Sequence, residues 1–461
     1  MARNFLGPQN RIGAPLNIMP AKAIAAKAKN LFFDRKLETM PRDALQQYQQ
    51  RRFRKMMEQV LKSNPFYRAK LHAAGIRRPP SPKSFTDIPF TTKAELVANQ
   101  LEHPPYGSDL TFPLKAYTRM HQTSGTTGVP VRWLDTPEGW QSFLDHWGHV
   151  LRGAGVEPGD IVYVAFSFGP FIGFWGGFEA AYQMGCRAVT GGGQTTEQRL
   201  ASMRNTPPTV LLCTPTYALR LAEEALALGI DTAKLGIRAS IHAGEPGAGI
   251  PATRRRIEQL WGCKAYDHSG MTETGAYGYE CRFQLGLHII ESGYIMEVID
   301  PETLRPVEDG RRGELVLTNL GRVGSPLIRY RTGDLMDITR KRCACGRTFA
   351  TARGGVLGRA DDMITVRGIN VFPSAIENIL RVFPEVVEFQ GEVTVQREMQ
   401  ELVLRVEVDS IPTDQRQPFA ERVISEMHTR LNLRPVVEFA APGTLPRAEM
   451  KSRRFQTPPR G

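Results

Sequence analysis

Cysteine is scarce in this chain, since only 6 of its 461 residues are cysteine. Cys343 and Cys345 lie close together, and the others are far apart, whereas small secreted proteins that depend on disulfides carry cysteines densely. The sequence therefore excludes a disulfide scaffold and indicates a reducing compartment, so we expect a cytoplasmic protein.

Long apolar segments are also missing. Residues 1–30 are basic but contain no compact apolar core followed by a cleavage site, which argues against a secretory signal. Residues 161–178 carry no charge over 18 positions, close to the length of a membrane span, but glycines and Pro170 interrupt them. We interpret this stretch as a buried strand (161–166), a turn and a helix, and we expect no membrane span.

Features of nucleic-acid-binding proteins are absent too. The chain has no long basic arm, no RNA-binding motif and no Cys2His2 zinc-finger spacing. Lys and Arg nevertheless outnumber Asp and Glu by 59 to 47, a formal charge of +12, and such a surface attracts polyanions. The positive residues are spread along the chain, so a solvated basic face explains most of them. We expect no nucleic-acid partner, and a nucleotide or coenzyme A (CoA) substrate remains open.

The order of the predicted elements organises the first three quarters of the chain. A helical pattern covers residues 41–74 with a break at Asn64–Pro65, and Thr91–Glu95 predicts a capped helix start. Strands and helices then alternate from Tyr117 onward, which predicts parallel α/β layers. The expected strands are 161–166, 209–213 and 237–242, and the expected helices are 171–185, 217–228 and 253–261.

Short strands follow between Ile289 and Asp337, with expected turns at Asp309–Gly310 and Thr332–Gly333. A smaller α+β unit begins near Gly358, with expected strands at 363–366, 386–395 and 402–408 and expected helices at 373–383 and 417–431. We therefore expect a poorly ordered leader (1–34), a large α/β domain (35–357), a small C-terminal domain (358–455) and a tail (456–461).

The strongest local signal is the glycine-rich segment Thr123–Pro130, which reads TSGTTGVP. Small residues let a backbone approach phosphate oxygens closely, and hydroxyl and N–H groups can then bind those oxygens. The segment is not a Walker A loop, because Lys-Ser/Thr does not follow its last glycine, and the strand-like residues 116–122 and 131–134 flank it. A polar turn between two strands is the alternative. The candidate phosphate-binding residues are Ser124, Gly125, Thr126, Thr127 and Gly128.

This segment resembles the phosphate-binding loop of adenylate-forming enzymes, and further motifs follow in that family's order. They are the adenine and acyl-site motif (Tyr266–Glu273), the ribose-binding aspartate motif (Tyr330–Asp334), the hinge motif (from Gly358–Asp362 to Glu377) and the catalytic-lysine motif (Pro446–Lys451). Five motifs in order make coincidence improbable.

Finer details are similar to phenylacetate–CoA ligases, and the resemblance covers residues 35 to 455. The matching segments are Leu37–Thr39, Asn64–Arg68, Phe90–Lys93, Glu280–Cys281 and Gly368–Pro373. The resemblance implies a large adenylate-forming domain of layered α/β subdomains and a small mobile α+β domain. It also implies an ATP-dependent ligase that joins a carboxylic acid to CoA through an acyl-adenylate, with Mg²⁺ as cofactor.

The resemblance assigns roles to residues whose types suit the chemistry. Adenylation brings two anions together, so positive charge and Mg²⁺ must stabilise the transition state. Lys451 is the expected catalytic cation, Glu273 an expected catalytic residue and Mg²⁺ ligand, and Thr272 a further catalytic residue. Asp334 can accept hydrogen bonds from both ribose hydroxyls. Without the resemblance, Lys451 could be a solvated tail cation, Glu273 a surface carboxylate and Asp334 a turn residue.

Further residues complete the expected nucleotide site and the hinge. Arg359 could neutralise phosphate or bind ribose, or it could form an interdomain salt bridge. Asp361 is the expected hinge residue, with a turn cap as the alternative. Tyr266 could stack on adenine or belong to the core. The other expected nucleotide contacts are Gly244, Glu245, Pro246 and Asp267.

Two positions depart from the family pattern. Val131 stands where a lysine often closes the phosphate-binding loop, and Met450 stands where glycine usually precedes the catalytic lysine. The second change could stiffen or reposition Lys451.

The cysteines suggest a metal site outside the reaction. Cys343-Ala344-Cys345 has the short spacing of a metal knuckle, and Cys281 and His288 could complete a tetrahedral set for zinc. Some proteins that resemble phenylacetate–CoA ligases carry zinc in this region. The expected role is structural, and the alternative is buried thiols beside a hydrogen-bonded histidine.

The acid itself is not encoded in a readable motif. The resemblance implies an aryl or arylacetic acid, and aromatic residues between 166 and 175 could pack against its ring or belong to the core. These residues are Phe166, Phe168, Phe171, Phe174 and Trp175.

Two other functions remain as alternatives to an acid–CoA ligase. The first is an enzyme that transfers its acyl or adenylyl group to another acceptor, as coenzyme F390 synthetase-like proteins or carrier-protein loaders do. The second is a basic binding protein. A homodimer is compatible with the sequence.

Overall fold

The computed structural model describes residues 31–123, 130–360, 364–366, 369–396, 399–409, 411–446 and 454–456. Helices come first in the described chain: α1 (Arg35–Glu38), α2 (Arg42–Ser63), α3 (Pro65–Ala73), η2 (Pro82–Asp87), α4 (Lys93–Glu102) and η3 (Leu114–Ala116). The predicted break between α2 and α3 is confirmed, because the Asn64 side chain accepts a hydrogen bond from the Tyr67 N–H and caps α3. The predicted start of α4 is also confirmed, with Thr92 and Glu95 forming a capping box.

A large sheet holds twelve of the described strands, and five of these are parallel to one another. Along the sheet these five run in the order β4-β3-β5-β6-β7. The strands are β3 (Ile161–Val164), β4 (Arg187–Thr190), β5 (Val210–Cys213), β6 (Ala239–His242) and β7 (Lys264–Met271). The connecting and flanking helices are α5 (Pro137–Gly153), α6 (Gly173–Gln183), α7 (Thr196–Asn205), α8 (Pro215–Ala227), η4 (Thr232–Lys234) and α9 (Pro251–Trp261). The predicted parallel α/β layers are therefore confirmed.

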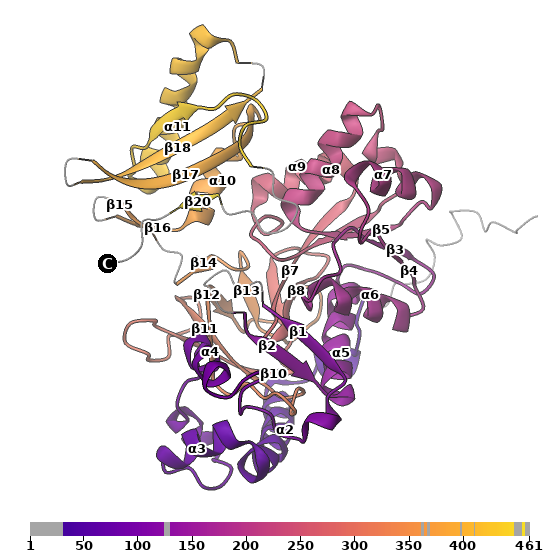
Figure 1. Cartoon of the computed structure of the whole chain (residues 1–461), viewed down its shortest axis with the longest axis vertical. Coiled ribbons are helices and arrows are strands. Elements are labelled where there is room, and N and C mark those ends of the chain that lie inside the picture. The colour runs from indigo at the N-terminus through magenta and orange to yellow at the C-terminus, as the bar shows by residue number, and fades with distance from the viewer. Residues whose placement is uncertain are drawn as a thin grey trace, which may run out of the picture. The chain divides into compact units, whose positions relative to one another are not determined.

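Helices cover both faces of the parallel strands (Figure 1), and alternate residues of β3 pack into two different cores. On β3, Val162 and Val164 pack into a core with α5 and α6, where Trp147 is buried. Tyr163 faces the other side and packs with α7, α8 and α9, where Trp261 is buried. A sheet covered on both faces needs apolar residues at successive positions, which explains why these strands carry apolar runs.

The other half of the large sheet is antiparallel and continues from β7 in the order β8-β9-β13-β12-β11-β10, with β14 paired to β12. Its strands are β8 (Gly275–Glu280), β9 (Gly286–Ile289), β10 (Tyr294–Ile299), β11 (Arg312–Asn319), β12 (Tyr330–Thr339), β13 (Thr351–Arg353) and β14 (Gly358–Arg359). The predicted turn at Asp309–Gly310 is present. The turn predicted at Thr332–Gly333 is wrong, because these residues lie within β12. Gly333 there has a φ of 76°, and the register with β11 shifts between Glu314 and Val316, so the pair forms an irregularity inside the strand.

The C-terminal segments form a second, four-stranded sheet in the order β19-β18-β17-β20, a separate two-stranded ladder of β15 with β16, and two helices. The elements are β15 (Ile364–Val366), β16 (Ile369–Val371), α10 (Pro373–Leu380), β17 (Val386–Gln396), β18 (Met399–Val408), η5 (Thr413–Gln415), α11 (Arg416–Leu431), β19 (Val436–Phe439) and β20 (Phe455–Gln456). Ile376 of α10 and Val423 of α11 are buried in a core of their own with Phe389 of β17. The expected small α+β unit is therefore confirmed.

Among the described residues, no helix has both the length and the apolar character needed to cross a membrane. The charge-free stretch 161–178 instead divides into β3 and part of α6, separated by a loop, as its glycines and proline predicted.

Candidate functional site

The strands beside the predicted phosphate-binding loop form a hairpin. Strands β1 (Arg119–Gln122) and β2 (Arg132–Asp135) pair antiparallel. At its loop end Thr123 donates its N–H to the Val131 carbonyl over 2.9 Å, and Val131 donates its N–H to Thr123 Oγ1 over 3.0 Å. These bonds fix the two ends of the loop. Ser124, Gly125, Thr126, Thr127 and Gly128 lie outside the described residues.

The predicted ribose-binding residue Asp334 lies in a hydrogen-bonded group at the boundary with β14. The Tyr277 hydroxyl of β8 donates to Asp334 Oδ2, and Arg359 Nη1 lies 3.2 Å from Oδ1. Strands β12 and β14 place Asp334 directly opposite Arg359. Burial and the negative charge of Asp334 raise the pKa of Tyr277 well above its usual value, so its hydroxyl stays a donor. The structure thus brings Asp334 and Arg359 together, and sequence reasoning missed Tyr277.

The predicted catalytic residues Thr272 and Glu273 occupy the connection between β7 and β8. A buried guanidinium holds this connection, since Arg322 Nη1 donates to the carbonyls of Thr272 and Glu273 over 2.9 and 3.0 Å. The Asn319 side chain adds a third bond, donating to the Thr274 carbonyl over 2.9 Å. No motif marked Arg322 or Asn319 in the sequence.

The Glu273 carboxylate fits a cation site. It is only 3% exposed, and its Oε1 has no hydrogen-bond partner among the described residues. The ammonium Nζ of Lys93, in the first turn of α4, lies 3.4 Å from that oxygen. A buried carboxylate oxygen with unused acceptor capacity suits a hard cation such as Mg²⁺.

The predicted Gly-Glu-Pro segment follows β6 at the same sheet edge as Asp267. Gly244 has a φ of 95°, which only glycine adopts readily. Glu245 Oε1 accepts the N–H of Thr216 at the start of α8 over 2.9 Å. Strand register places His242 opposite Asp267, so Gly244, Glu245 and Pro246 leave the sheet beside the adenine motif.

Asp267 belongs to a group of two carboxyls and one guanidinium. Its backbone N–H donates to Glu280 Oε2 over 2.8 Å, and Arg254 Nη2 lies 2.7 Å from Glu280 Oε1. Burial raises the pKa of both Asp267 and Glu280, and the charge of Arg254 opposes that rise. The neighbouring Tyr266 is 9% exposed and packs in the main core, so stacking of Tyr266 on adenine remains a prediction.

Two residues predicted to act from the C-terminal domain, Lys451 and Asp361, lie outside the described residues. Arg454, close to Lys451 in the sequence, is buried and contacts Glu388 Oε1 over 2.7 Å and Glu377 Oε1 over 3.0 Å. Burial alone would lower the pKa of Arg454, but the two carboxylates raise it.

The aromatic segment after β3 lies against β1. The Gln122 N–H donates to the Pro170 carbonyl over 2.8 Å, which ties the segment to the strand before the phosphate-binding loop. The rings of Phe166 and Phe174 lie 4.4 Å apart, and those of Phe168 and Trp175 lie 4.6 Å apart. Phe174 belongs to the core, whereas Phe166, Phe168, Phe171 and Trp175 are only partly buried.

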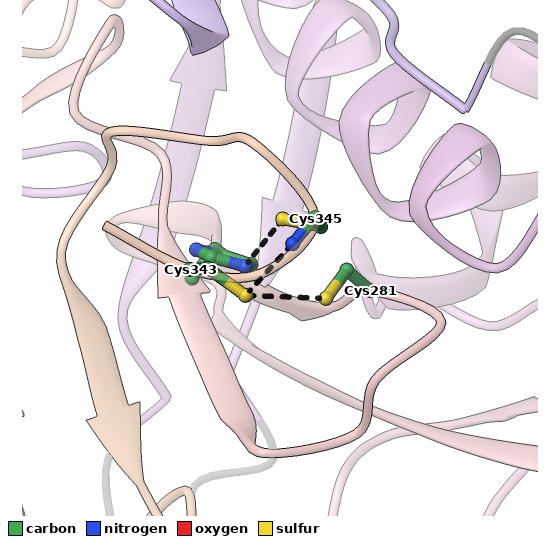
Figure 2. A group of neighbouring side chains, drawn as sticks. Cys281, Cys343 and Cys345 are labelled. Carbon is green, nitrogen blue, oxygen red and sulfur yellow. Dashed lines mark hydrogen bonds between the residues drawn. The ribbon is translucent and has the colours of Figure 1, made fainter. Parts of the chain in front are cut away.

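The four predicted metal ligands converge. Cys281 follows β8, His288 lies on β9, and Cys343 and Cys345 lie in the loop between β12 and β13. Their ligand atoms all lie within 4.8 Å of one another, and Figure 2 shows the three thiols pointing toward a common centre. The Cys281 and Cys343 sulfurs are 3.9 Å apart, and Cys345 Sγ is 3.5 Å from His288 Nε2.

The environment of His288 also fits a metal ligand. Its Nδ1 lies 3.3 Å from the Phe349 carbonyl and 3.2 Å from Thr351 Oγ1, which leaves Nε2 directed at the thiols. A metal-binding histidine ordinarily donates its other N–H to such an acceptor. Three thiols and one imidazole are a zinc donor set.

Comparisons with known proteins agree with this geometry. Residues 118–321 match the model of the AMP-binding enzyme family, and residues 368–457 match that of the AMP-binding enzyme C-terminal domain. The phenylacetate-coenzyme A ligase of Thermus thermophilus is 32% identical over 446 residues, covering 91% of this chain and 97% of that protein. The phenylacetate-coenzyme A ligase of Escherichia coli is 31% identical over 433 residues, covering 90% and 95%.

A solved structure is similar over nearly the whole chain. It is a 2-hydroxyisobutyryl-CoA ligase in the postadenylation state in complex with 2-HIB-AMP. Its TM-score is 0.89 at 29% identity, covering 97% of this chain and 95% of that one. The chain therefore belongs to the phenylacetate–CoA ligase family of adenylate-forming, AMP-binding enzymes, and it is an AMP-forming acid–CoA ligase.

Proposed function

We propose that this ligase activates an aryl or arylacetic acid. The observation that carries the proposal is the partly buried aromatic segment, with Phe166, Phe168 and Trp175, tied by Pro170 to the strand that leads into the phosphate-binding loop. Aromatic side chains offer a flat apolar surface on which another ring can pack. The names of the Thermus thermophilus and Escherichia coli relatives, which specify phenylacetate, support the same class of acid.

The reaction proceeds in two steps on one site. A carboxylate oxygen of the acid attacks the α-phosphorus of ATP, a P–O bond forms, and pyrophosphate leaves with the electrons of the broken P–O bond. The CoA thiolate then attacks the acyl carbon, a C–S bond forms, the C–O bond between the acyl carbon and the phosphate breaks, and AMP leaves with the electrons of that bond. Both steps bring anions together, so the protein must supply fixed positive charge and hydrogen-bond donors.

Particular residues take these roles in the proposal. Asp334 binds the ribose hydroxyls, with Arg359 beside it, and the group of Gly244, Glu245, Pro246, Tyr266 and Asp267 lies against adenine. Ser124, Gly125, Thr126, Thr127 and Gly128 bind the phosphates. Thr272 and Glu273 act at the reacting end, where Glu273 would hold the Mg²⁺ that neutralises phosphate charge. Lys451 supplies the cation for adenylation.

We also propose the domain organisation expected from the sequence. Residues 35–357 form the adenylation domain, residues 358–455 form a mobile domain that carries Lys451, and Asp361 is the hinge between them. A few residues that absorb a large φ/ψ change are enough for such a movement. Withdrawal of Lys451 after adenylation gives CoA access to the acyl-adenylate.

A panel of acids tests the substrate class. AMP release is measured with and without CoA for phenylacetate, benzoate, 2-hydroxyisobutyrate and acetate. Phenylacetate or benzoate should give the highest kcat/KM, and AMP release should require CoA. A kcat/KM for an aliphatic acid that is roughly tenfold higher than the values for both aryl acids would contradict the proposed class of acid. A pocket shaped for one class of acid can produce a roughly tenfold difference in kcat/KM. Pyrophosphate exchange without thioester formation would point to the non-CoA acceptor.

A matched pair of variants ties the preference to the aromatic segment. Phe168 is partly buried against Trp175 and Phe178, so Phe168→Leu should raise the KM for the aryl acid and leave the KM for ATP unchanged. Phe283 serves as the control, because it is exposed and outside this segment. Equal effects of Phe168→Leu and Phe283→Leu would contradict the location of the acid.

A further inference from the structure

Tyr277 joins two parts of the site that motifs alone leave separate. It is 1% exposed on β8, and its hydroxyl donates to Oδ2 of Asp334 on β12. Strand β8 pairs with β7, which carries the predicted adenine motif, and Ser269 of that motif faces Gly278, the next residue after Tyr277, across the β7–β8 ladder. Tyr277 therefore links the ribose motif to the strand beside the adenine motif.

The second neighbour of Asp334 competes for the same carboxylate. Arg359 Nη1 lies 3.2 Å from Oδ1 of Asp334 and also donates to the Thr332 carbonyl over 3.2 Å. A guanidinium and a carboxylate that are free to rotate prefer a two-pronged pair that uses both oxygens. The Tyr277 hydroxyl already bound at Oδ2 opposes that rotation, and the contact of Arg359 Nη1 is with Oδ1.

The orientation of the carboxylate decides what else it can bind. An ionised carboxylate has about four acceptor positions, and Tyr277 and Arg359 bind different oxygens of the Asp334 carboxylate. The Asp334 side chain is 9% exposed, so a small part of its surface is open to a ligand. A diol can bind only if both oxygens keep acceptor capacity on that open side.

We propose that Tyr277 is a positioning residue that orients the Asp334 carboxylate toward the ribose hydroxyls and so sets the discrimination between ribonucleotides and deoxyribonucleotides. This inference rests on the proposed role of Asp334 in ribose binding. Without the phenol hydroxyl, Asp334 turns to Arg359, forms the two-pronged pair and accepts one or neither hydroxyl of the ribose.

The test uses ATP, 2′-deoxyATP and 3′-deoxyATP in the pyrophosphate-exchange reaction of the full-length enzyme. Wild type should favour ATP by roughly tenfold or more in kcat/KM, as expected for a site that hydrogen-bonds a hydroxyl. Tyr277→Phe should raise the KM for ATP by roughly tenfold, leave the KM for the deoxynucleotides nearly unchanged and so remove the preference. The kcat with ATP should change little.

Tyr279→Phe is the matched control. Tyr279 lies on the same strand, is 0% exposed, and its hydroxyl also donates to a carboxylate, Oε2 of Glu38 over 2.8 Å. Tyr279→Phe should lower the melting temperature without changing the ratio of kcat/KM for ATP to kcat/KM for deoxyATP. A change of that ratio in Tyr279→Phe equal to the change in Tyr277→Phe would overturn the inference, because the effect would then come from loss of stability.

Asp334→Asn separates the inference from the proposal beneath it. An unchanged ratio in Asp334→Asn would remove the ribose role of Asp334 itself. A changed ratio in Asp334→Asn with an unchanged ratio in Tyr277→Phe would keep that role and overturn the inference about Tyr277. If Tyr277→Phe lacks a cooperative thermal transition, Tyr277→Met replaces it, because a flexible apolar side chain can fill the space but cannot donate to Oδ2 of Asp334. The preference for ATP over the deoxynucleotides must fall in that variant, or the inference is overturned.

Discussion

Arg322 and Asp135 form a two-pronged ion pair inside the protein, with 2.7 Å between Nε and Oδ1 and 2.6 Å between Nη2 and Oδ2. Each side chain is 1% exposed. The remaining nitrogen, Nη1, is the one that donates to the carbonyls of Thr272 and Glu273. The pair therefore holds the connection that carries two predicted catalytic residues to the hairpin that flanks the phosphate-binding loop.

Removing one partner of this pair should be costly. Arg322→Met leaves the Asp135 carboxylate buried and without its cation, which costs about 3–5 kcal/mol in the free energy of unfolding. The double variant Arg322→Met/Asp135→Leu leaves neither charge and should recover most of that loss. Both variants lack the donor to Thr272 and Glu273, so both should lose most of the pyrophosphate-exchange rate. Urea unfolding and exchange assays measure the two effects, and a double variant with wild-type exchange would contradict the proposed anchoring.

The second prediction concerns the metal. Protein purified without added metal should contain about one zinc per chain, as three thiols and an imidazole predict. Cys343→Ser should lower the zinc content and the melting temperature together, because metal binding to a structural site contributes directly to folding. Cys186 is buried outside the cluster, so Cys186→Ser should keep the zinc. Wild-type protein that contains no metal, and whose melting temperature does not rise when zinc is added, would exclude a structural zinc site.

How much the sequence predicts depends on how far apart the interacting residues lie. The grouping of Cys281, His288, Cys343 and Cys345 was predicted, because the Cys343–Cys345 knuckle restricts the choice of partners. The parallel strands were predicted as well, because buried strands and helices alternate along the chain. Asp135 and Arg322 lie 187 residues apart, and no local pattern marks either of them. Tyr277 lies outside every predicted motif and element, so nothing in the sequence marked it.

The wrong turn at Thr332–Gly333 has a related cause. A Thr-Gly-Asp sequence favours a turn when it is considered locally. Here Glu314 of the neighbouring β11 accepts the Gly333 N–H over 3.1 Å, and Thr332 Oγ1 donates to the Leu315 carbonyl over 2.7 Å. Pairing with β11 thus turns the expected turn into an irregularity of the strand, and this pairing is invisible in the sequence.

The third prediction separates the two half-reactions. If Lys451 contacts the adenylation transition state, Lys451→Ala should lower acyl-AMP formation by about 100-fold, by analogy with the loss of an oxyanion donor. Thioester formation from supplied acyl-AMP should fall much less. Lys115 is exposed and outside the predicted motifs, so Lys115→Ala serves as the control for loss of one positive charge. Equal losses in both half-reactions of Lys451→Ala would contradict the assignment.

The last prediction concerns Glu38, which lies in a segment that resembles the family and has no part in the proposed reaction. Glu38 is 0% exposed. Its carboxylate accepts hydrogen bonds from the Tyr279 hydroxyl and from Arg347 Nε, and His149 Nδ1 lies 3.2 Å away. Burial pushes the pKa of Glu38 up, but His149, Arg347 and Tyr279 together outweigh burial and lower the pKa from 4.5 to about 2.

A carboxyl whose pKa is lowered by folding stabilises the fold while it is ionised. The contribution of ionised Glu38 to the free energy of unfolding is complete above pH 4.5 and is lost as the pH falls from 4.5 toward 2. It amounts to about 3 kcal/mol. Glu38→Gln should therefore lower the free energy of unfolding by about that amount at pH 7, and its difference from wild type should narrow as the pH is lowered toward 3. Urea unfolding across this range measures the difference. Glu308→Gln, at an exposed position, should show a small difference at every pH, and a Glu38→Gln difference that stays constant down to pH 3 would contradict the lowered pKa.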